Sequence, residues 1–254
     1  MTDIRQELTE KAKNIGVKIK PGQAEQFQKY MELLLEWNEK MNLTAITEPS
    51  AIVEKHFVDS LTLLNALDIK QGAKLIDVGT GAGFPGIPLK IMRPDLELTL
   101  LDSLNKRLNF LGAVCEELGI SSARVHKRAE EAGLERTMRE AYDVAVARAV
   151  APMQILCEYC IPLIKMKGYF IAMKGPAAAE ELKEAGRAIE LLGGSEPQAV
   201  PVTLPEGEER EILIVRKTRF TPKGYPRHGG TISKHPLGEV SAGEKPERRG
   251  GAAK

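Results

Sequence analysis

The residues best suited to bind a ligand lie in one glycine-rich segment, Asp77-Val78-Gly79-Thr80-Gly81-Ala82-Gly83. Glycine has no Cβ and accepts positive φ angles, so a ligand can approach its backbone N–H groups closely. A second carboxylate, Asp102, ends the apolar run at 98–101. A carboxylate placed about twenty residues after such a turn commonly binds a ribose. The spacing therefore predicts a site for a nucleoside-containing cofactor.

Two kinds of cofactor fit this turn. Gly81, Gly83 and Gly86 match the dinucleotide spacing Gly-x-Gly-x-x-Gly, which is typical of an NAD-dependent oxidoreductase. However, Asp77 lies just before the glycines, where it would repel a pyrophosphate. Its carboxylate suits a cationic ligand group, such as the amino-acid end of S-adenosylmethionine. Alternatively, it suits backbone amides, which would hold the carboxylate by hydrogen bonds. The pattern acid-x-Gly-x-Gly-x-Gly is complete, so we favour S-adenosyl-L-methionine and a methyltransferase over a dinucleotide.

The elements around this turn alternate between strand and helix from residue 73 onward. We expect strands near 74–78, 98–102, 123–127, 142–147, 168–174, 196–202 and 210–216, and helices near 86–92, 105–118, 129–138, 151–161 and 178–192. Alternation of this kind indicates a parallel sheet with helices on both faces. The link at 203–209 is too short for a parallel crossover, so the last two strands must be antiparallel. The prediction is an α/β, Rossmann-like fold of the class I S-adenosylmethionine-dependent methyltransferases, with seven strands, the last one antiparallel.

Three regions are predicted along the chain. Residues 1–70 form a helical extension packed on the core, with helices near 3–15, 23–41 and 50–66, and residues 71–217 form the methyltransferase domain. Residues 218–254 form a basic, flexible tail. In the third helix His56, Asp59 and Ser60 share one face. Their polar groups either form hydrogen bonds with one another where two domains meet, or line the cofactor or substrate cleft. The spacing fits both interpretations.

Composition narrows the class of protein. The chain has 254 residues, 43% of them hydrophobic, and lacks both a signal-peptide pattern and an apolar run of the roughly 20 residues that cross a bilayer. We therefore expect a cytoplasmic protein with no membrane contact. Cys157 and Cys160 lie one helical turn apart among apolar residues, which favours a core helix over a metal or redox site, and no metal is predicted. Residues 216–254 carry a net charge of +7 on a body of −6, so the tail either binds a polyanion or is a solvated extension.

Several separate motifs make the chain resemble the glucose-inhibited division protein B family over about residues 25–237. Members of that family are bacterial RNA methyltransferases that place a methyl group on N7 of a guanosine in small-subunit (16S) ribosomal RNA, near the decoding site. The motifs appear in the family's order and are Trp37-Asn38, Asn42-Leu43-Thr44, His56-Phe57-Val58-Asp59-Ser60, Asp77 through Pro88, Leu101-Asp102-Ser103, Lys106-Arg107, Arg128-Ala129-Glu130, Arg148-Ala149-Val150 and Lys174-Gly175. The stretch from Glu239 onward matches nothing in the family.

The resemblance implies roles for individual residues. Gly79 and Phe84 would contact the cofactor, Asp102 would hold its ribose, Ala129 and Glu130 would flank the adenine, and Arg148 would lie at the active-site mouth. The implied partner is small-subunit ribosomal RNA or the 30S particle, bound by a monomer. Candidates for RNA contacts are Lys106, Arg107, Lys174, Lys223 and Arg227.

Methyl transfer to guanine N7 needs no general base, because N7 presents a lone pair and no proton. The residues would instead align the reacting groups and hold an exposed base, and the candidates for this catalytic work are Arg148, His56 and Asn42. Arg148 ends an apolar strand at the carboxyl edge of the sheet, where open α/β folds bind ligands. Alternatives are a methyltransferase acting on a different RNA, a protein or a small molecule, and a non-catalytic RNA-binding module.

Overall fold

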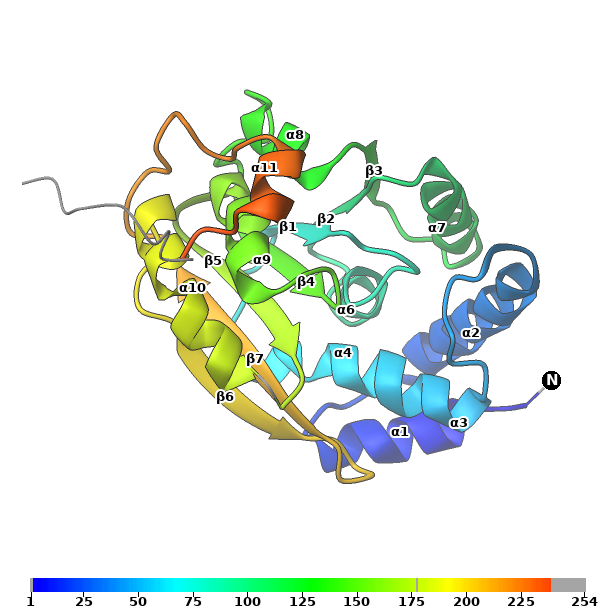
Figure 1. Ribbon diagram of the computed structural model, residues 1–254. Coiled ribbons are helices and arrows are strands. Elements are labelled where there is room, and N and C mark those ends of the chain that lie inside the picture. Colours follow the sequence, from blue (N-terminus) through cyan, green and yellow to red (C-terminus); the bar gives the residue numbers. More distant parts are fainter. Residues whose placement is uncertain (1, 177, 239–254) are drawn as a thin grey trace, which may run out of the picture.

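The computed structural model describes residues 2–176 and 178–238. Within these residues the centre is a seven-stranded sheet with the order β3-β2-β1-β4-β5-β7-β6 (Figure 1). The strands from β1 to β5 pair in parallel, whereas β7 runs antiparallel to both β5 and β6. Their bounds are β1 (Lys74–Val78), β2 (Glu97–Asp102), β3 (Ala123–His126), β4 (Tyr142–Arg148), β5 (Ile164–Lys174), β6 (Gln198–Thr203) and β7 (Glu209–Arg216). The predicted fold class is confirmed.

Successive apolar side chains on the strands point to opposite faces and build two cores. Leu75 faces one core and Ile76 faces the other. The first core contains α1 (Arg5–Asn14), α2 (Pro21–Met41), α6 (Gly86–Met92) and α7 (Asn105–Glu117). The second contains α8 (Ala129–Leu134), α9 (Met153–Cys160) and α10 (Ala178–Leu192). Cys157 and Cys160 are buried in the second core, as their spacing predicts.

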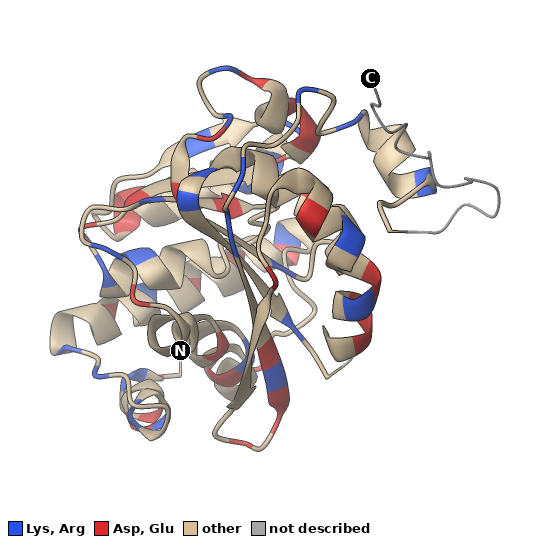
Figure 2. Ribbon diagram, turned by 90° about the vertical axis from the view of Figure 1, so that its left-hand side faces the viewer, with Lys and Arg blue, Asp and Glu red and all other residues tan. Residues whose placement is uncertain are grey.

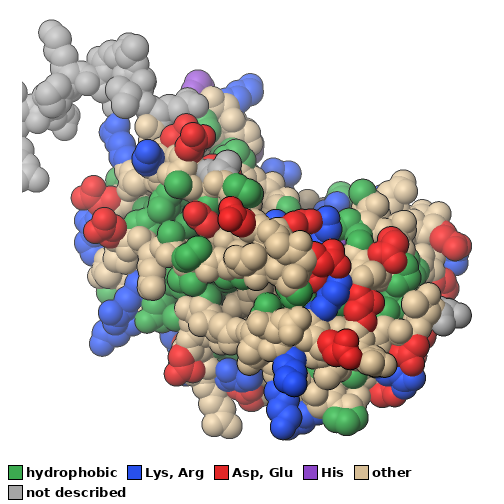
Figure 3. All heavy atoms as spheres, turned by 90° about the horizontal axis from the view of Figure 1, so that it is seen from below, with side chains coloured by type: hydrophobic (Ala, Val, Ile, Leu, Met, Phe, Trp, Pro, Cys, Tyr) green, Lys and Arg blue, Asp and Glu red, His purple; other side chains and the backbone are tan. Residues whose placement is uncertain are grey.

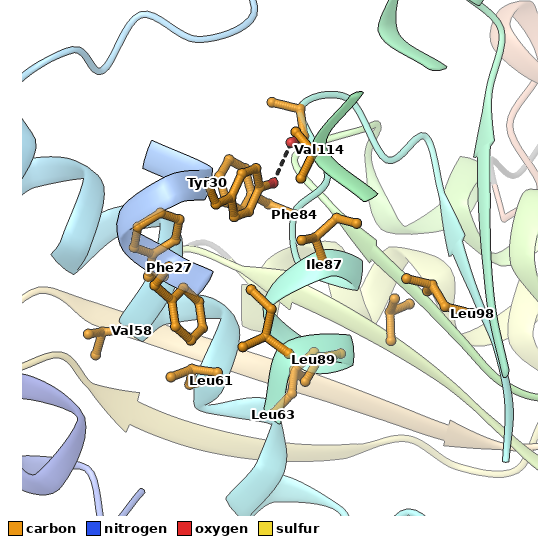
Figure 4. Packing of buried hydrophobic residues seen from close by; sticks show 14 of the residues in the cluster. Phe27, Tyr30, Val58, Leu61, Leu63, Phe84, Ile87, Leu89, Leu98 and Val114 are labelled. Carbon is orange, nitrogen blue, oxygen red and sulfur yellow. Dashed lines mark hydrogen bonds between the residues drawn. The ribbon is translucent and has the colours of Figure 1, made fainter. Parts of the chain in front are cut away.

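The N-terminal helices share the first core with the sheet. The predicted third helix begins at Pro49 and consists of α3 (Pro49–Ile52), a π-helical turn η1 (Val53–Val58), α4 (Asp59–Leu61) and α5 (Leu63–Ala66). Phe27 and Tyr30 of α2 contact Phe57 of η1, with ring centroids 5.0 and 5.5 Å apart. Figure 4 shows Phe27 and Tyr30 directed toward this helical run and the residues after β1. The helical extension is thus joined to the sheet by a continuous apolar core.

The segment 218–238 corrects the prediction of a flexible tail. It contains α11 (Gly229–Lys234), whose Ile232 is fully buried in the second core. Lys217, also fully buried, forms an ion pair with Glu140 at 2.8 Å, and Arg227 forms one with the buried Glu158 at 2.8 Å. Carboxylates from distant elements therefore bind Lys217 and Arg227, and the charge pattern of the segment cannot reveal them. The predicted tail beyond residue 238 lies outside the described residues.

Charges of both signs are mixed in the two views drawn in Figures 2 and 3. Figure 2 shows acidic and basic residues alternating near the turn of the β6–β7 hairpin, and Figure 3 shows the two signs interspersed on the face it presents. On these faces the described basic residues are therefore not gathered into one separate patch.

No helix among the described residues is both long and apolar enough to cross a lipid bilayer.

Candidate functional site

The glycine turn after β1 has the backbone conformation that its glycines allow. The φ angles of Gly79, Gly81 and Gly83 are +69°, +59° and +101°, all in the left-handed region. A Cβ on Gly79 would lie 2.8 Å from Val150 Cγ2, and one on Gly83 would lie 2.5 Å from Tyr30 Oη. Glycine is therefore required both by the backbone angles and by the close approach of two other elements.

The side chain of Asp77 forms hydrogen bonds with the glycine turn. This side chain is fully buried, and Oδ2 accepts hydrogen bonds from Thr80 Oγ1 at 2.7 Å and Gly86 N at 2.9 Å. Burial raises the pKa of Asp77 to about 6, against the lowering effect of these hydrogen bonds. Of the two roles considered for this carboxylate, the structure shows contacts with the backbone and side chains of the turn itself.

Asp102 lies at the carboxyl end of β2, beside the turn. Its Oδ2 accepts from Gly81 N and its Oδ1 from Leu104 N, both at 2.9 Å. Only 3% of the residue is exposed. Arg107 Nη1 also donates to Oδ2, at 3.5 Å. Oδ1 has a further lone pair, so Asp102 can still accept a hydrogen bond from a ligand hydroxyl, such as one of a ribose.

A first cleft of about 510 Å³ opens at this edge of the sheet. It brings together Gly79, Asp102, Ala129 and Glu130 from the predicted cofactor site, and Arg107 from the predicted RNA contacts. Glu130 is 5% exposed and forms an ion pair with Arg128. The other residues that line the cleft are Val78, Leu101, Ser103, Lys127, Arg128, Ala149, Val150, Ala151, Ile155, Tyr159 and Ser233. Its volume, its carboxylates and its exposed glycine backbone fit a nucleoside cofactor such as S-adenosylmethionine.

A second cleft of about 450 Å³ adjoins the first, and Ala149 lines both. It contains Arg148, His56 and Lys174 from the predicted site. The remaining residues that line it are Ile46, Lys55, Asp59, Ala149, Met173, Gly175, Glu181 and Arg210. Two clefts that meet at one residue suit a reaction in which a group passes from a donor in one cleft to an acceptor in the other.

Arg148 is held firmly at the wall of the second cleft. Its Nη1 donates to Lys55 O at 2.9 Å and to Asp59 Oδ2 at 2.8 Å, and its guanidinium carbon lies 5.0 Å from the centre of the Phe84 ring. The Asp59 side chain is 5% exposed and the Arg148 side chain 13%. The ion pair fixes the end of β4 relative to the helical extension.

His56 is neutral in this setting. Burial, followed by the nearby charge of Arg148, lowers its pKa to about 4. Arg148 Nη2 can only donate, so His56 Nδ1 at 3.2 Å accepts, and His56 Nε2 carries the hydrogen toward Thr44 Oγ1 at 2.9 Å. His56 thus orients Arg148 rather than supplying a proton. Ser60 Oγ donates to His56 O within the helical extension. Of the three residues predicted to share one helix face, His56 and Asp59 line the second cleft, whereas Ser60 makes this contact with the helix backbone.

Phe84 lies in an aromatic stack between the turn and the helical extension. Its ring centroid is 4.5 Å from that of His56 and 5.3 Å from that of Tyr30, and 6% of the residue is exposed. Tyr30 Oη donates a hydrogen bond to Ala82 O at 2.5 Å, drawn as the dashed line in Figure 4. Phe84 lines neither cleft, and its observed contacts connect the glycine turn to α2 and η1.

The other predicted residues are spread over the surface. Asn42 ends α2 with φ +49° and is exposed, as are Lys106 and Lys223. Arg227 donates to Glu158 through Nε and Nη2. Gly81 and Gly83 shape the turn, but neither they nor these four residues line the two clefts.

Residues that were not predicted as site residues complete both clefts. Ala149 adopts φ +55°, a conformation that its type does not signal. Tyr159 reads as part of a core helix and Ser233 as part of a tail, yet both line the first cleft. Glu181, Lys55 and Arg210 carry charges typical of solvated surface positions. Only their places in the folded chain connect them to the site.

Comparisons with known proteins identify the family of the chain. The family model described as rRNA small subunit methyltransferase G matches residues 23–213. Proteins named Ribosomal RNA small subunit methyltransferase G are similar in sequence: that of Alkaliphilus metalliredigens is 50% identical over 232 residues (91% of this chain, 97% of the relative), and that of Desulforamulus reducens 47% over 239 residues (93% and 100%). A predicted O-methyltransferase from Agrobacterium tumefaciens shares the fold, with a TM-score of 0.51, 14% identity and coverage of 66% of this chain and 84% of that one. The chain belongs to the rRNA small subunit methyltransferase G family.

Proposed function

We propose that the protein transfers a methyl group from S-adenosylmethionine to N7 of a guanosine in small-subunit ribosomal RNA, near the decoding site. The observation that carries the proposal is the pair of clefts that meet at Ala149. One has the groups that suit a nucleoside, and the other has the charged and apolar walls that suit a base. The name shared by the relatives supports ribosomal RNA as substrate. The proposed setting is the cytoplasm, with a monomer acting on the RNA or the 30S particle.

The first cleft would hold the cofactor. Asp102 would accept a hydrogen bond from the ribose, Ala129 and Glu130 would flank the adenine, and the backbone at Gly79 would approach the amino-acid part. All four residues line that cleft. When bound, S-adenosylmethionine supplies a methyl group on a positively charged sulfur.

The second cleft would hold the acceptor base. Guanine N7 has a lone pair and no proton, so the residues around it need only orient the base and exclude water. Neutral His56 and the fixed Arg148 suit this task, because they hold the β4 end rigidly beside the shared wall at Ala149. Orientation of this kind contributes up to about 7–11 kcal/mol in favourable systems.

The test is mass mapping of ribosomal RNA from cells with and without the gene, together with purified protein and labelled S-adenosylmethionine. Small subunits, bare ribosomal RNA and protein extract are offered as separate substrates. The expected result is label on guanine N7 in small-subunit RNA and loss of that modification in cells lacking the gene. Labelled protein with unlabelled RNA would overturn the proposal.

A further inference from the structure

Lys174 occupies a distinctive place in the second cleft. It ends β5 next to the end of β4, where Arg148 pairs with Met173 in the sheet register. Its side chain is 10% exposed. Its Nζ donates to Ala151 O at 2.8 Å and to Glu181 Oε2 at 2.6 Å. A lysine ammonium has three hydrogens, so these two contacts with described residues leave one hydrogen for a ligand in the cleft.

The surroundings of Lys174 favour a base over a phosphate. Phosphate contacts set the register and orientation of a nucleic acid on a protein, whereas the Lys174 side chain is only 10% exposed and lines a cleft. Met173 and Ile46 give the cleft apolar walls against which a base can pack. Ala151, whose carbonyl accepts from Lys174, also lines the first cleft. The free hydrogen therefore lies near the boundary across which a methyl group would pass.

We propose that Lys174 donates a hydrogen bond to O6 of the acceptor guanine and thereby selects guanine over adenine; this rests on the proposed function. O6 lies beside N7 on the same edge of the base. Guanine presents acceptors at both positions, whereas adenine presents N7 beside an amino donor. An ammonium at this point stabilises the first and opposes the second.

Glu181 makes this arrangement compatible with the reaction. Methylation at N7 leaves a positive charge on the base, which an isolated ammonium would repel. Glu181 Oε2 accepts from Lys174 Nζ and also from Met153 N at 2.8 Å. The carboxylate thus offsets the charge of Lys174 and fixes its position, so we assign Glu181 as a positioning residue.

The experiment replaces one base of the substrate. Mass mapping first locates the modified guanosine, and RNA is then prepared with either guanosine or 2,6-diaminopurine riboside at that position. The analogue keeps N7 and the 2-amino group but carries an amino donor in place of O6 and has no hydrogen on N1. We expect kcat/KM of the unaltered protein to be about 10- to 100-fold higher for guanosine than for the analogue. The reason is that the analogue replaces a charge-assisted hydrogen bond with two donors that face each other.

Variants assign this discrimination to Lys174. Lys174→Met should bring the guanosine-to-diaminopurine ratio close to one while calorimetry shows unchanged binding of S-adenosylmethionine. Lys165→Met is the matched control, since Lys165 pairs with Asp143 outside both clefts, and it should keep the full ratio. If Lys174→Met does not fold, Glu181→Gln serves instead, with the ratio expected to fall partway.

Two outcomes would overturn the inference. One is a ratio near one in the unaltered protein, and the other is an unchanged ratio in the Lys174 and Glu181 variants, which would indicate a phosphate contact or a structural role. Either can occur while guanosine N7 is still methylated. Failure of the proposed function itself would appear differently, as no N7 methylation of guanosine by the unaltered protein.

Discussion

Replacing Tyr30 with Phe would remove one hydroxyl from the contact between α2 and the glycine turn. Tyr30 is fully buried, and its Oη donates to Ala82 O at 2.5 Å. Phe keeps the ring contacts with Phe57 and Phe84, whose centroids lie 5.5 and 5.3 Å away. Burial raises the pKa of Tyr30 well above its usual value, so the hydroxyl keeps its proton at neutral pH. The substitution therefore isolates the hydrogen bond from the packing.

The expected magnitude follows from the carbonyl that is left behind. Ala82 is 6% exposed, so water cannot readily replace the lost donor. An unsatisfied buried group costs about 1–3 kcal/mol, and we expect the free energy of unfolding to fall by that amount. Because Ala82 lies between Gly81 and Gly83, the affinity for S-adenosylmethionine should also weaken, by up to about tenfold if about 1.4 kcal/mol of the loss acts on the turn.

Urea unfolding and isothermal titration calorimetry measure the two effects. Tyr169→Phe is the matched control, because Tyr169 is partly buried against the same core and makes no hydrogen bond through its hydroxyl with the described residues. Its free energy of unfolding should change by less than about 0.5 kcal/mol. Equal stability and equal cofactor affinity in the two variants would refute the view that α2 holds the turn.

Three further predictions concern other parts of the site. Gly79→Ala should reduce cofactor affinity by more than about tenfold in calorimetry, because it forces a Cβ to within 2.8 Å of Val150. Acidification from pH 7 to pH 5 should lower the free energy of unfolding by about 2 kcal/mol more in the unaltered protein than in His56→Asn. The reason is that the unfolded imidazole gains its proton near 6.5 and the folded one only near 4; urea unfolding at the two pH values measures it. Truncation after Lys217 should abolish cofactor binding, since it removes Ser233 from the first cleft and Ile232 from the core.

Each of these predictions has a control. Gly72→Ala has a similar φ of +65° but no atom within 4 Å of the added Cβ, so it should affect stability alone. Asp77 gains a proton in the folded state near pH 6, above its usual 3.8. It therefore adds stability on acidification, but equally in both proteins of the His56 comparison. Truncation after Gly238 should keep cofactor affinity and weaken the salt dependence of RNA binding. An unaltered salt slope would mean that the tail makes no phosphate contacts.

The sequence predicted the sheet well because the sheet depends on local patterns. Each apolar run, turn and helical period lies within a few residues, and the seven-residue link at 203–209 alone requires an antiparallel pair. The segment 218–238 was wrongly predicted as a tail, because its Thr221 and Arg227 bind Glu140 and Glu158, which are far away in sequence. Composition records charges but not their partners.

Only part of the candidate site could be predicted from the sequence, again because local patterns do not show contacts between distant residues. Residue types and spacing predicted a glycine turn after the first strand, and the structure shows that turn. They could not show that Asp77 and Phe84 point away from the first cleft toward the core. Ser233 and Lys174 reach the two clefts only through the order of strands and helices. The directions of side chains and the contacts between distant elements depend on the tertiary structure, which no local sequence pattern contains.

The position of β7 between β5 and β6 affects how the chain can fold while it is being synthesised. Within residues 2–176 and 178–238, β6 pairs in the sheet with β7 alone, and β7 is the last of the described strands to emerge. Until residue 216 has left the ribosome, the outer edge of β5 keeps unpaired N–H and C=O groups that another chain could bind. Ser233, which lines the first cleft, emerges later still. A nascent chain therefore passes through a stage with most of its sheet, an open edge and an incomplete cofactor cleft.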